Sequence, residues 1–112
     1  MRIEVRGRNT EVTEELRERV EKRFAKVDRQ VSRLARMEVE LLEERNPSIH
    51  DSQIAEATLY LKGVTLRARE ASDSMVHSVN HVADDLARQV KRHRDKRRRR
   101  RATEVEARPA AS

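Results

Sequence analysis

The stretch AEATLYLKGVTLRAR, residues 55–69, decides the fold. Apolar and polar side chains alternate on both sides of Lys62-Gly63, which is the pattern of strands that bury one face. A short glycine-containing turn between two such runs is typical of a β-hairpin. We therefore expect antiparallel strands over residues 55–61 and 64–69. The side chains of the first strand expected to face the core are Ala55, Ala57, Leu59 and Leu61.

Another strand is predicted upstream of the hairpin. Residues 35–41, ARMEVEL, alternate in the same way, whereas residues 43–52 contain Asn46-Pro47 and predict a loop. A short connection of this kind favours antiparallel pairing with the hairpin. Residues 2–6 form a fourth alternating run that ends before Gly7-Arg8-Asn9.

A first amphipathic helix is predicted between these two upstream strands. Thr13 is a suitable N-cap, and Glu14 and Glu15 stand where the helix dipole favours negative charge. The helix should continue to about Arg29. Its apolar stripe consists of Leu16, Val20, Phe24, Val27 and Val31.

A second, longer helix is predicted after the hairpin. Ser72 to Ser74 include cap-type residues, and the helix should run to Lys96 or beyond. Its apolar stripe consists of Met75, Val79, Val82, Ala83, Leu86 and Val90.

The predicted order is therefore β-α-β-β-β-α. The first two strands should pair in parallel because a helix joins them. A sheet with one solvent-exposed face must have its other face covered by other elements. We expect an α+β fold, a two-layer sandwich of a four-stranded mixed sheet with both helices on one face.

The charge of the chain is concentrated at its end. The 112 residues carry a net charge of +6 with 41% charged and 2% aromatic residues, and their number suits one domain. Residues 1–87 hold 15 Lys and Arg against 17 Asp and Glu, whereas residues 88–112 hold 11 against 3. We expect a binding domain over residues 1–96 and a disordered, arginine-rich tail over residues 97–112. Such a charge favours a polyanionic partner, either a nucleic acid or an anionic membrane surface.

The composition argues against an enzyme. The sequence has no cysteine, no glycine-rich phosphate loop and no recognisable Ser/His/Asp constellation. His77 and His81 lie one helical turn apart, but a metal site needs a third supported ligand, so we expect no metal and no cofactor. No run approaches the ~20 apolar residues of a membrane span, and no signal peptide is visible. We therefore expect a soluble cytoplasmic protein that has neither a membrane nor a small-molecule substrate as its partner.

Cationic side chains on both predicted helices are the candidate binding surface. On the first helix, the outward face carries Arg19, Lys22, Lys26 and Arg29. An alternative is that Glu15 and Glu18 pair with Arg19 and Lys22 and only support the helix. On the second helix the outward cations are Arg88, Lys91 and Arg92, with Arg94 and Lys96 beside them. Ten cations between Arg88 and Arg101 are opposed only by Asp95, which exceeds what solubility requires and favours nucleic acid.

Three motifs resemble the short ribosome hibernation-promoting factors, relatives of the ribosome-associated inhibitor called protein Y. Residues 86–96, LARQVKRHRDK, resemble the family's LARQ helix with its following basic residues. Residues 23–27, RFAKV, and residues 56–59, EATL, are similar to its K-F-A-K-L and D-A-T-L segments. The resemblance covers roughly residues 1–96, and it departs at Val76, where the family usually has Tyr.

The resemblance implies the same β-α-β-β-β-α fold, similar to double-stranded-RNA-binding domains. It also implies binding to small-subunit rRNA in the decoding channel, where mRNA and tRNA are blocked and translation stops under stress or in stationary phase. The rRNA-contacting positions carried over are Arg23, Lys26, Arg88, Lys91, Arg92, Arg94 and Lys96, to which helix geometry adds Lys22 and Arg29. No self-dimerisation domain is expected. The alternatives are a generic double-stranded-RNA-binding protein or RNA chaperone, and an interaction fragment of a larger regulator.

Overall fold

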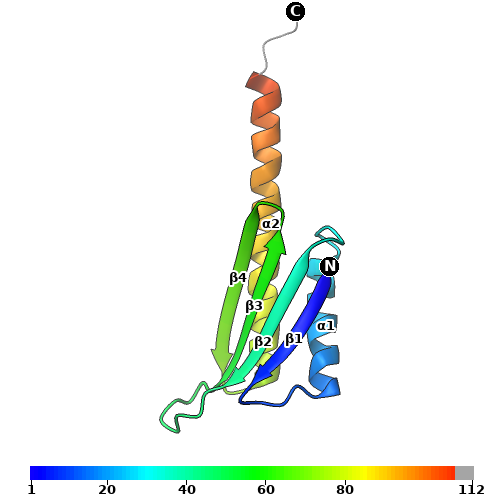
Figure 1. The fold of residues 1–112 in the computed structure, drawn as a ribbon. Coiled ribbons are helices and arrows are strands. Elements are labelled where there is room, and N and C mark those ends of the chain that lie inside the picture. The colour runs from blue at the N-terminus through cyan, green and yellow to red at the C-terminus, as the bar shows by residue number, and fades with distance from the viewer. Residues whose placement is uncertain (108–112) are drawn as a thin grey trace, which may run out of the picture.

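The computed structural model describes residues 1–107, with side chains described through Thr103. The predicted element order is confirmed (Figure 1). The elements are β1 (Arg2–Arg8), α1 (Glu14–Asp28), β2 (Arg36–Glu43), β3 (Gln53–Leu61), β4 (Val64–Ser72) and α2 (Met75–Ala107).

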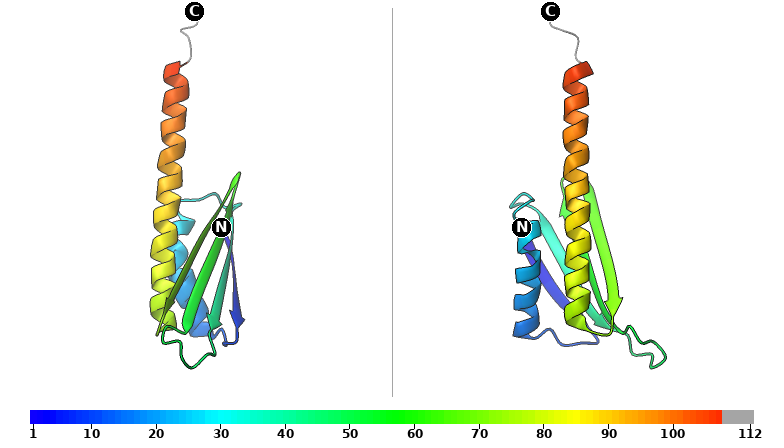
Figure 2. Two further views of the ribbon diagram at one scale, coloured as in Figure 1. Left: turned by 90° about the vertical axis from the view of Figure 1, so that its left-hand side faces the viewer. Right: turned by 180° about the vertical axis from the view of Figure 1, so that it is seen from behind.

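The four strands form one mixed sheet in the order β1-β2-β3-β4. β1 and β2 pair in parallel, with Val5 opposite Val39, because α1 returns the chain to the same end of the sheet. The β2–β3 and β3–β4 pairs are antiparallel, as the sequence predicted. Figure 2 shows that both helices lie on one face and leave the other face open.

Two glycines meet different backbone requirements. Gly63 has a φ of +80° at the turn between Leu61 and Val64, which a residue without Cβ adopts at little cost. Gly7, predicted to end β1, instead remains in the strand opposite Leu41, and the break comes at Asn9 with a φ of 57°. A Cβ on Gly7 would collide with the Thr10 carbonyl oxygen, so only glycine lets the chain turn back this closely.

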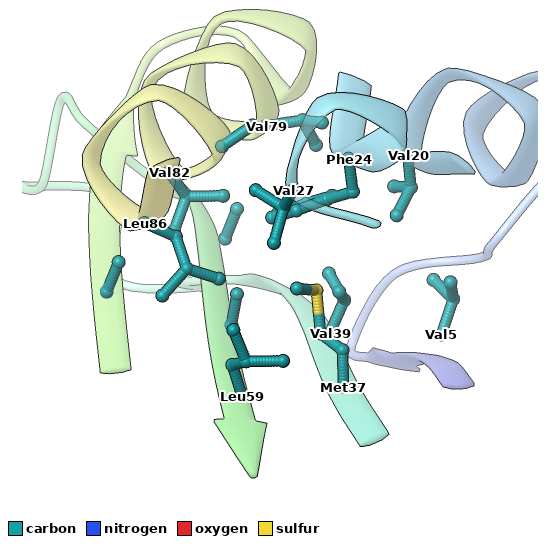
Figure 3. Close-up of a cluster of buried hydrophobic side chains, with 14 of the residues drawn as sticks. Val5, Val20, Phe24, Val27, Met37, Val39, Leu59, Val79, Val82 and Leu86 are labelled. Carbon is teal, nitrogen blue, oxygen red and sulfur yellow. The ribbon is translucent and has the colours of Figure 1, made fainter. Parts of the chain in front are cut away.

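The core lies between the sheet and the two helices (Figure 3). Phe24 of α1 is the only phenylalanine of the chain and is fully buried. The aliphatic side chains buried around it are Val20, Val27, Met37, Val39, Leu41, Leu59, Val79, Val82, Leu86 and Val90. The predicted stripe members Leu16, Val31 and Met75 pack against this core but are only partly buried. The apolar stripes therefore fix which side of each helix faces outward.

Polar contacts fix where each helix begins. The predicted N-cap is confirmed, because the Leu16 backbone N–H donates to Thr13 Oγ1 at 3.2 Å. At the start of α2, the hydroxyl of fully buried Ser78 donates to the Gln53 carbonyl oxygen at 2.6 Å and lies 2.7 Å from Ser72 Oγ. This cluster joins α2 to the ends of β3 and β4.

The end of α2 differs from the sequence prediction. Residues 97–107 continue the helix instead of forming an irregular tail, and residues 108–112 lie outside the described part of the chain. Arginine has a high helix propensity, and repulsion between like charges three and four residues apart costs only about 0.2–0.5 kcal/mol per pair, so the run of arginines does not by itself end the helix. The Thr103 hydroxyl also donates to the Arg99 carbonyl oxygen at 2.9 Å. Among residues 1–107, no helix has both the length and the apolar character needed to cross a membrane.

Candidate nucleic-acid interface

A groove runs between α1 and α2 on the side of the molecule opposite the open sheet face. Its uncharged and acidic lining residues are Gln30, Ala83, Asp84 and Ala87. Its cations are five of the nine predicted site residues, namely Arg23, Lys26, Arg88, Lys91 and Arg94. The structure thus brings together predicted residues that are separated by more than sixty positions in the sequence.

Helix periodicity explains why these side chains meet. On α1, Phe24 and Val27 face the sheet, so their neighbours Arg23 and Lys26 fall on the flank next to α2. On α2, burial of the Leu86 and Val90 side chains turns the flank that carries Lys91 toward α1. The spacing of Arg88, Lys91 and Arg94 at intervals of three keeps all of them on or near this flank.

The other four predicted residues lie elsewhere. Arg92 and Lys96 line a second hollow with Leu66 of β4, on the opposite flank of α2. In that hollow, the Gln89 side-chain amide donates to the Arg67 carbonyl oxygen at 2.7 Å and holds α2 to the edge strand. Lys22 and Arg29 are exposed on α1 but do not line the groove. The nine predicted residues therefore lie on both flanks of α2 and on two sides of α1, and the groove holds the largest group of them.

The cations of the two helices are largely unpaired. Among residues 1–103, only Arg88 of the nine predicted residues has a carboxylate oxygen within 4.0 Å, that of Asp85 at 3.8 Å. Glu18 does not pair with Lys22, nor Glu15 with Arg19, in that part of the chain, so the helix-support alternative for α1 is not realised. The positive charge of this side is left available to an external anion.

The open sheet face has the opposite character. Its arginines pair with glutamates of neighbouring strands: Arg6 with Glu38 at 3.7 Å, Arg8 with Glu40 at 3.9 Å, and Arg69 with Glu56 at 3.1 Å. These cross-strand pairs neutralise three arginines of this face within the chain, while Arg36 and Arg67 have no carboxylate within 4.0 Å among residues 1–103.

Tyr60 is held within the same open face. Its hydroxyl donates to Glu38 Oε2 at 3.3 Å, and the Arg36 guanidinium carbon lies 4.5 Å from its ring centroid. Tyr60 thus takes part in cross-strand packing.

Two buried polar atoms in the groove have no partner. Within the described side chains, Arg94 Nε and Gln30 Oε1 are inaccessible to solvent and make no hydrogen bond. Sequence reasoning missed Gln30 because it follows the predicted end of the helix. The backbone N–H of Gln30 still donates to the Val27 carbonyl oxygen at 2.9 Å, and the 23, 26, 30 spacing was the signal that places it beside Arg23 and Lys26.

The two histidines of α2 stack on one another. The ring centroids of His77 and His81 are 6.4 Å apart and the planes differ by 5°. No group of three His, Cys, Asp or Glu side chains within the described residues is arranged to hold a metal ion.

Similarity to known proteins covers most of the chain. The family model described as Sigma 54 modulation protein / S30EA ribosomal protein matches residues 3–98. The ribosome hibernation promoting factor of Salmonella typhimurium is 35% identical over 96 residues, covering 86% of this chain and 96% of that protein. That of Escherichia coli K12 is 33% identical with the same coverage. The ribosome hibernation promotion factor of Picosynechococcus is 32% identical over 97 residues, but the chain spans only 50% of its length.

Solved structures show the same architecture. The N-terminal domain of Thermus thermophilus protein Y superposes with a TM-score of 0.72 at 30% identity, covering 83% of this chain and 99% of that chain. A ribosomal subunit interface protein from Coxiella burnetii has the same TM-score at 21% identity, covering 85% of this chain and 99% of its own, which supports the fold alone.

Proposed function

The chain belongs to the Sigma 54 modulation protein / S30EA ribosomal protein family, and from this premise we propose that it is a ribosome hibernation factor. In this proposal it binds rRNA of the small subunit in the decoding channel, around the A and P sites. There it excludes mRNA and tRNA and stops translation under stress or in stationary phase. It acts by occupying the site and catalyses no reaction.

The unpaired cations of the α1/α2 groove are the observation that carries this proposal. Lysine and arginine side chains that have no carboxylate partner in the free protein can contact phosphate without first breaking an ion pair. The groove is lined from two elements, so it can follow a backbone that bends or changes direction. A single helix packed on the sheet would present cations on its outward side only.

The composition of the groove favours recognition of RNA shape. Arginine and lysine contacts to phosphate position a protein without reading base identity. The groove contains no aromatic side chain on which a base could stack. Specificity for the ribosome then arises from the fixed arrangement of phosphates in folded rRNA, which matches the fixed distance between α1 and α2.

Charge reversal in the groove tests the proposal. The groove variant carries Arg23→Glu, Lys26→Glu and Lys91→Glu, all at exposed positions. The sheet-side variant carries Arg2→Glu, Arg45→Glu and Arg67→Glu, which are also exposed and change the net charge equally. We expect wild type and the sheet-side variant to co-sediment with purified small subunits at near-physiological salt, and the groove variant to stay in the supernatant. Equal pelleting of both variants contradicts the proposal.

A competition experiment separates this function from generic duplex binding. A hibernation factor remains on small subunits in the presence of an excess of naked RNA duplex, because the duplex lacks the arrangement of phosphates found in the decoding channel. A generic double-stranded-RNA-binding protein or RNA chaperone is displaced by the duplex in proportion to its concentration. Reduced peptide synthesis in a purified translation system by wild type, and not by the groove variant, then tests the block of mRNA and tRNA.

A further inference from the structure

The last three turns of α2 form an arm that leaves the body of the protein. Figures 1 and 2 show the helix continuing past the ends of the sheet and of α1. Arg94 and Lys96 are the last residues that line a hollow together with another element. Residues 97–107, here called the arm, are helical in the described structure and have no role in the core, which ends at Val90.

The first five residues of the arm present positive charge around the whole circumference of the helix, and Glu104 and Glu106 follow, so five Arg against two Glu leave the arm a net charge of +3. Successive helical residues are rotated by about 100°, so the run of arginines from Arg97 to Arg101 covers every direction about the axis. All five side chains are exposed, and none is paired with a carboxylate of residues 1–103. Like charges three and four residues apart each cost a helix about 0.2–0.5 kcal/mol. The free arm therefore carries a repulsion that an external polyanion would relieve.

The arm also prolongs both cationic flanks of α2. Arg98 and Arg101 continue the groove flank, four and seven residues after Arg94. Arg99 continues the opposite flank, three residues after Lys96. Two rows of cations thus leave the body on opposite sides of one helix. A single strand of phosphates lying along the helix could contact only one of these rows.

We propose that the arm is a second RNA-binding element, which lies over the narrow major groove of double-stranded RNA and contacts the phosphate backbones on both of its rims. The choice of RNA as the polyanion rests on the proposed function. A helix with its side chains is about 10–12 Å across, which is too wide to enter the deep, narrow major groove of A-form RNA, but a helix lying over that groove can reach phosphates on both rims. The arm holds no aromatic side chain for stacking on single-stranded bases. The apolar residues of the arm are Ala102, Val105 and Ala107, none of them large, so the arm lacks the broad apolar face that a helix at a membrane surface inserts.

Two variants of the full chain test the arm. In the first, Arg97 to Arg101 are all replaced by alanine, which removes the charge and retains helix propensity. In the second, Arg97→Pro is combined with Ala102→Arg, which keeps the number of arginines and the net charge but breaks the helix where the arm begins. Thermal unfolding of both should match wild type, because the buried core ends at Val90.

The probe is a labelled RNA hairpin with two turns of duplex, titrated at several salt concentrations. We expect the alanine variant to lower the slope of log K against log salt by about 3, as loss of three or four phosphate contacts requires. The proline variant should show at least half of this reduction in slope, since its arginines no longer lie in two rows. If the alanine variant binds the hairpin as tightly as wild type, the proposal is overturned. If the proline variant does so, the helical geometry is overturned and the segment acts only as a basic tail.

Two further measurements separate this inference from its premise. If wild type fails to pellet with small subunits but the arm variants lose hairpin binding, the proposed function fails and the arm remains an RNA-binding element. If wild type pellets and all three proteins bind the hairpin alike, the arm inference alone fails. Vesicles of phosphatidylglycerol and phosphatidylcholine serve as the competing anionic surface. Retention of wild type on these vesicles in the presence of excess hairpin also overturns the proposal.

Discussion

Arg94 on α2 and Gln30 just beyond α1 line the same groove, and each holds a buried polar atom that makes no hydrogen bond within the described side chains. An unpaired buried donor or acceptor costs about 1–3 kcal/mol. The two atoms are a donor, Arg94 Nε, and an acceptor, Gln30 Oε1. This part of the groove is therefore less stable than its packing would allow, in the place where the proposed ligand binds.

Replacing Arg94 by methionine should separate stability from binding. The aliphatic part of the side chain is kept and the unpaired Nε is removed, so we expect the free energy of unfolding to stay equal or rise by about 1 kcal/mol. Binding to small subunits should weaken at the same time, because a groove cation is lost. Urea unfolding and co-sedimentation measure the two effects.

Arg92→Met is the matched control for this prediction. Arg92 is exposed and has no buried unpaired atom, so its replacement should leave the unfolding free energy within about 0.5 kcal/mol of wild type. A clear loss of stability in Arg94→Met would show that the guanidinium supports the fold.

Binding to small subunits should depend steeply on salt. If wild type neutralises ~6–10 phosphates, its affinity falls by about three to five decades between ~50 and ~200 mM monovalent salt. The groove variant should show a shallower slope as well as weaker binding, whereas the sheet-side variant should keep the wild-type slope. Sedimentation at a series of salt concentrations gives all three slopes. A flat response of wild type would exclude an electrostatic mechanism.

Alanine at the two glycines should destabilise the protein for different reasons. Gly7→Ala places a Cβ against the Thr10 carbonyl oxygen, and the rigid backbone there gives a cost of about 1–3 kcal/mol. Gly63→Ala meets open space but must adopt a positive φ, which costs about 1–2 kcal/mol.

Asparagine at the same positions distinguishes the two causes. Asparagine tolerates the left-handed region, so Gly63→Asn should recover most of the stability that Gly63→Ala loses. Gly7→Asn should recover nothing, since its Cβ meets the same oxygen. Equal recovery at both sites in chemical denaturation would contradict this assignment.

Removing the hydroxyl of Ser78 should loosen the start of α2. Ser78→Ala leaves the Gln53 carbonyl oxygen without this donor, and we expect the unfolding free energy to fall by about 1–3 kcal/mol. Ser48→Ala in the exposed β2–β3 loop is the control and should change it by less than about 0.5 kcal/mol. Amide hydrogen exchange should locate the loss of protection in the first turn of α2 and the adjoining end of β3.

Local patterns were sufficient to predict most of the fold. Alternation in residues 35–41 and 55–69 gave the strands and their buried faces, and Thr13 gave the start of α1, because each signal depends only on neighbouring residues. The end of α2 was predicted only approximately: the helix was expected to reach Lys96 or beyond, and it continues to Ala107, through the first part of the expected disordered tail. Repulsion between adjacent arginines was expected to end the helix, whereas their intrinsic helix propensity prevails through Ala107.

The site was predicted less completely, for a geometric reason. Which flank of α1 meets α2 depends on how the helices pack on the sheet, and this packing is not encoded in the spacing of one helix. Lys22 and Arg29 were chosen on the face opposite the apolar stripe, but the groove opens on the flank. Gln30 carries no charge and lies beyond the C-cap, so no search for cations could find it.

The ion pairs across the open sheet face, such as Arg69 with Glu56, have a consequence for encounter with a polyanion. They pair cations on the strand side, whereas Arg23, Lys26, Lys91 and Arg94 in the groove have no carboxylate within 4.0 Å among residues 1–103, so the unpaired positive charge is concentrated on the helices. In an external negative field such a particle experiences a torque as well as an attraction. The protein would therefore approach a polyanion with its helices facing it, and fewer encounters would occur in orientations that do not lead to binding.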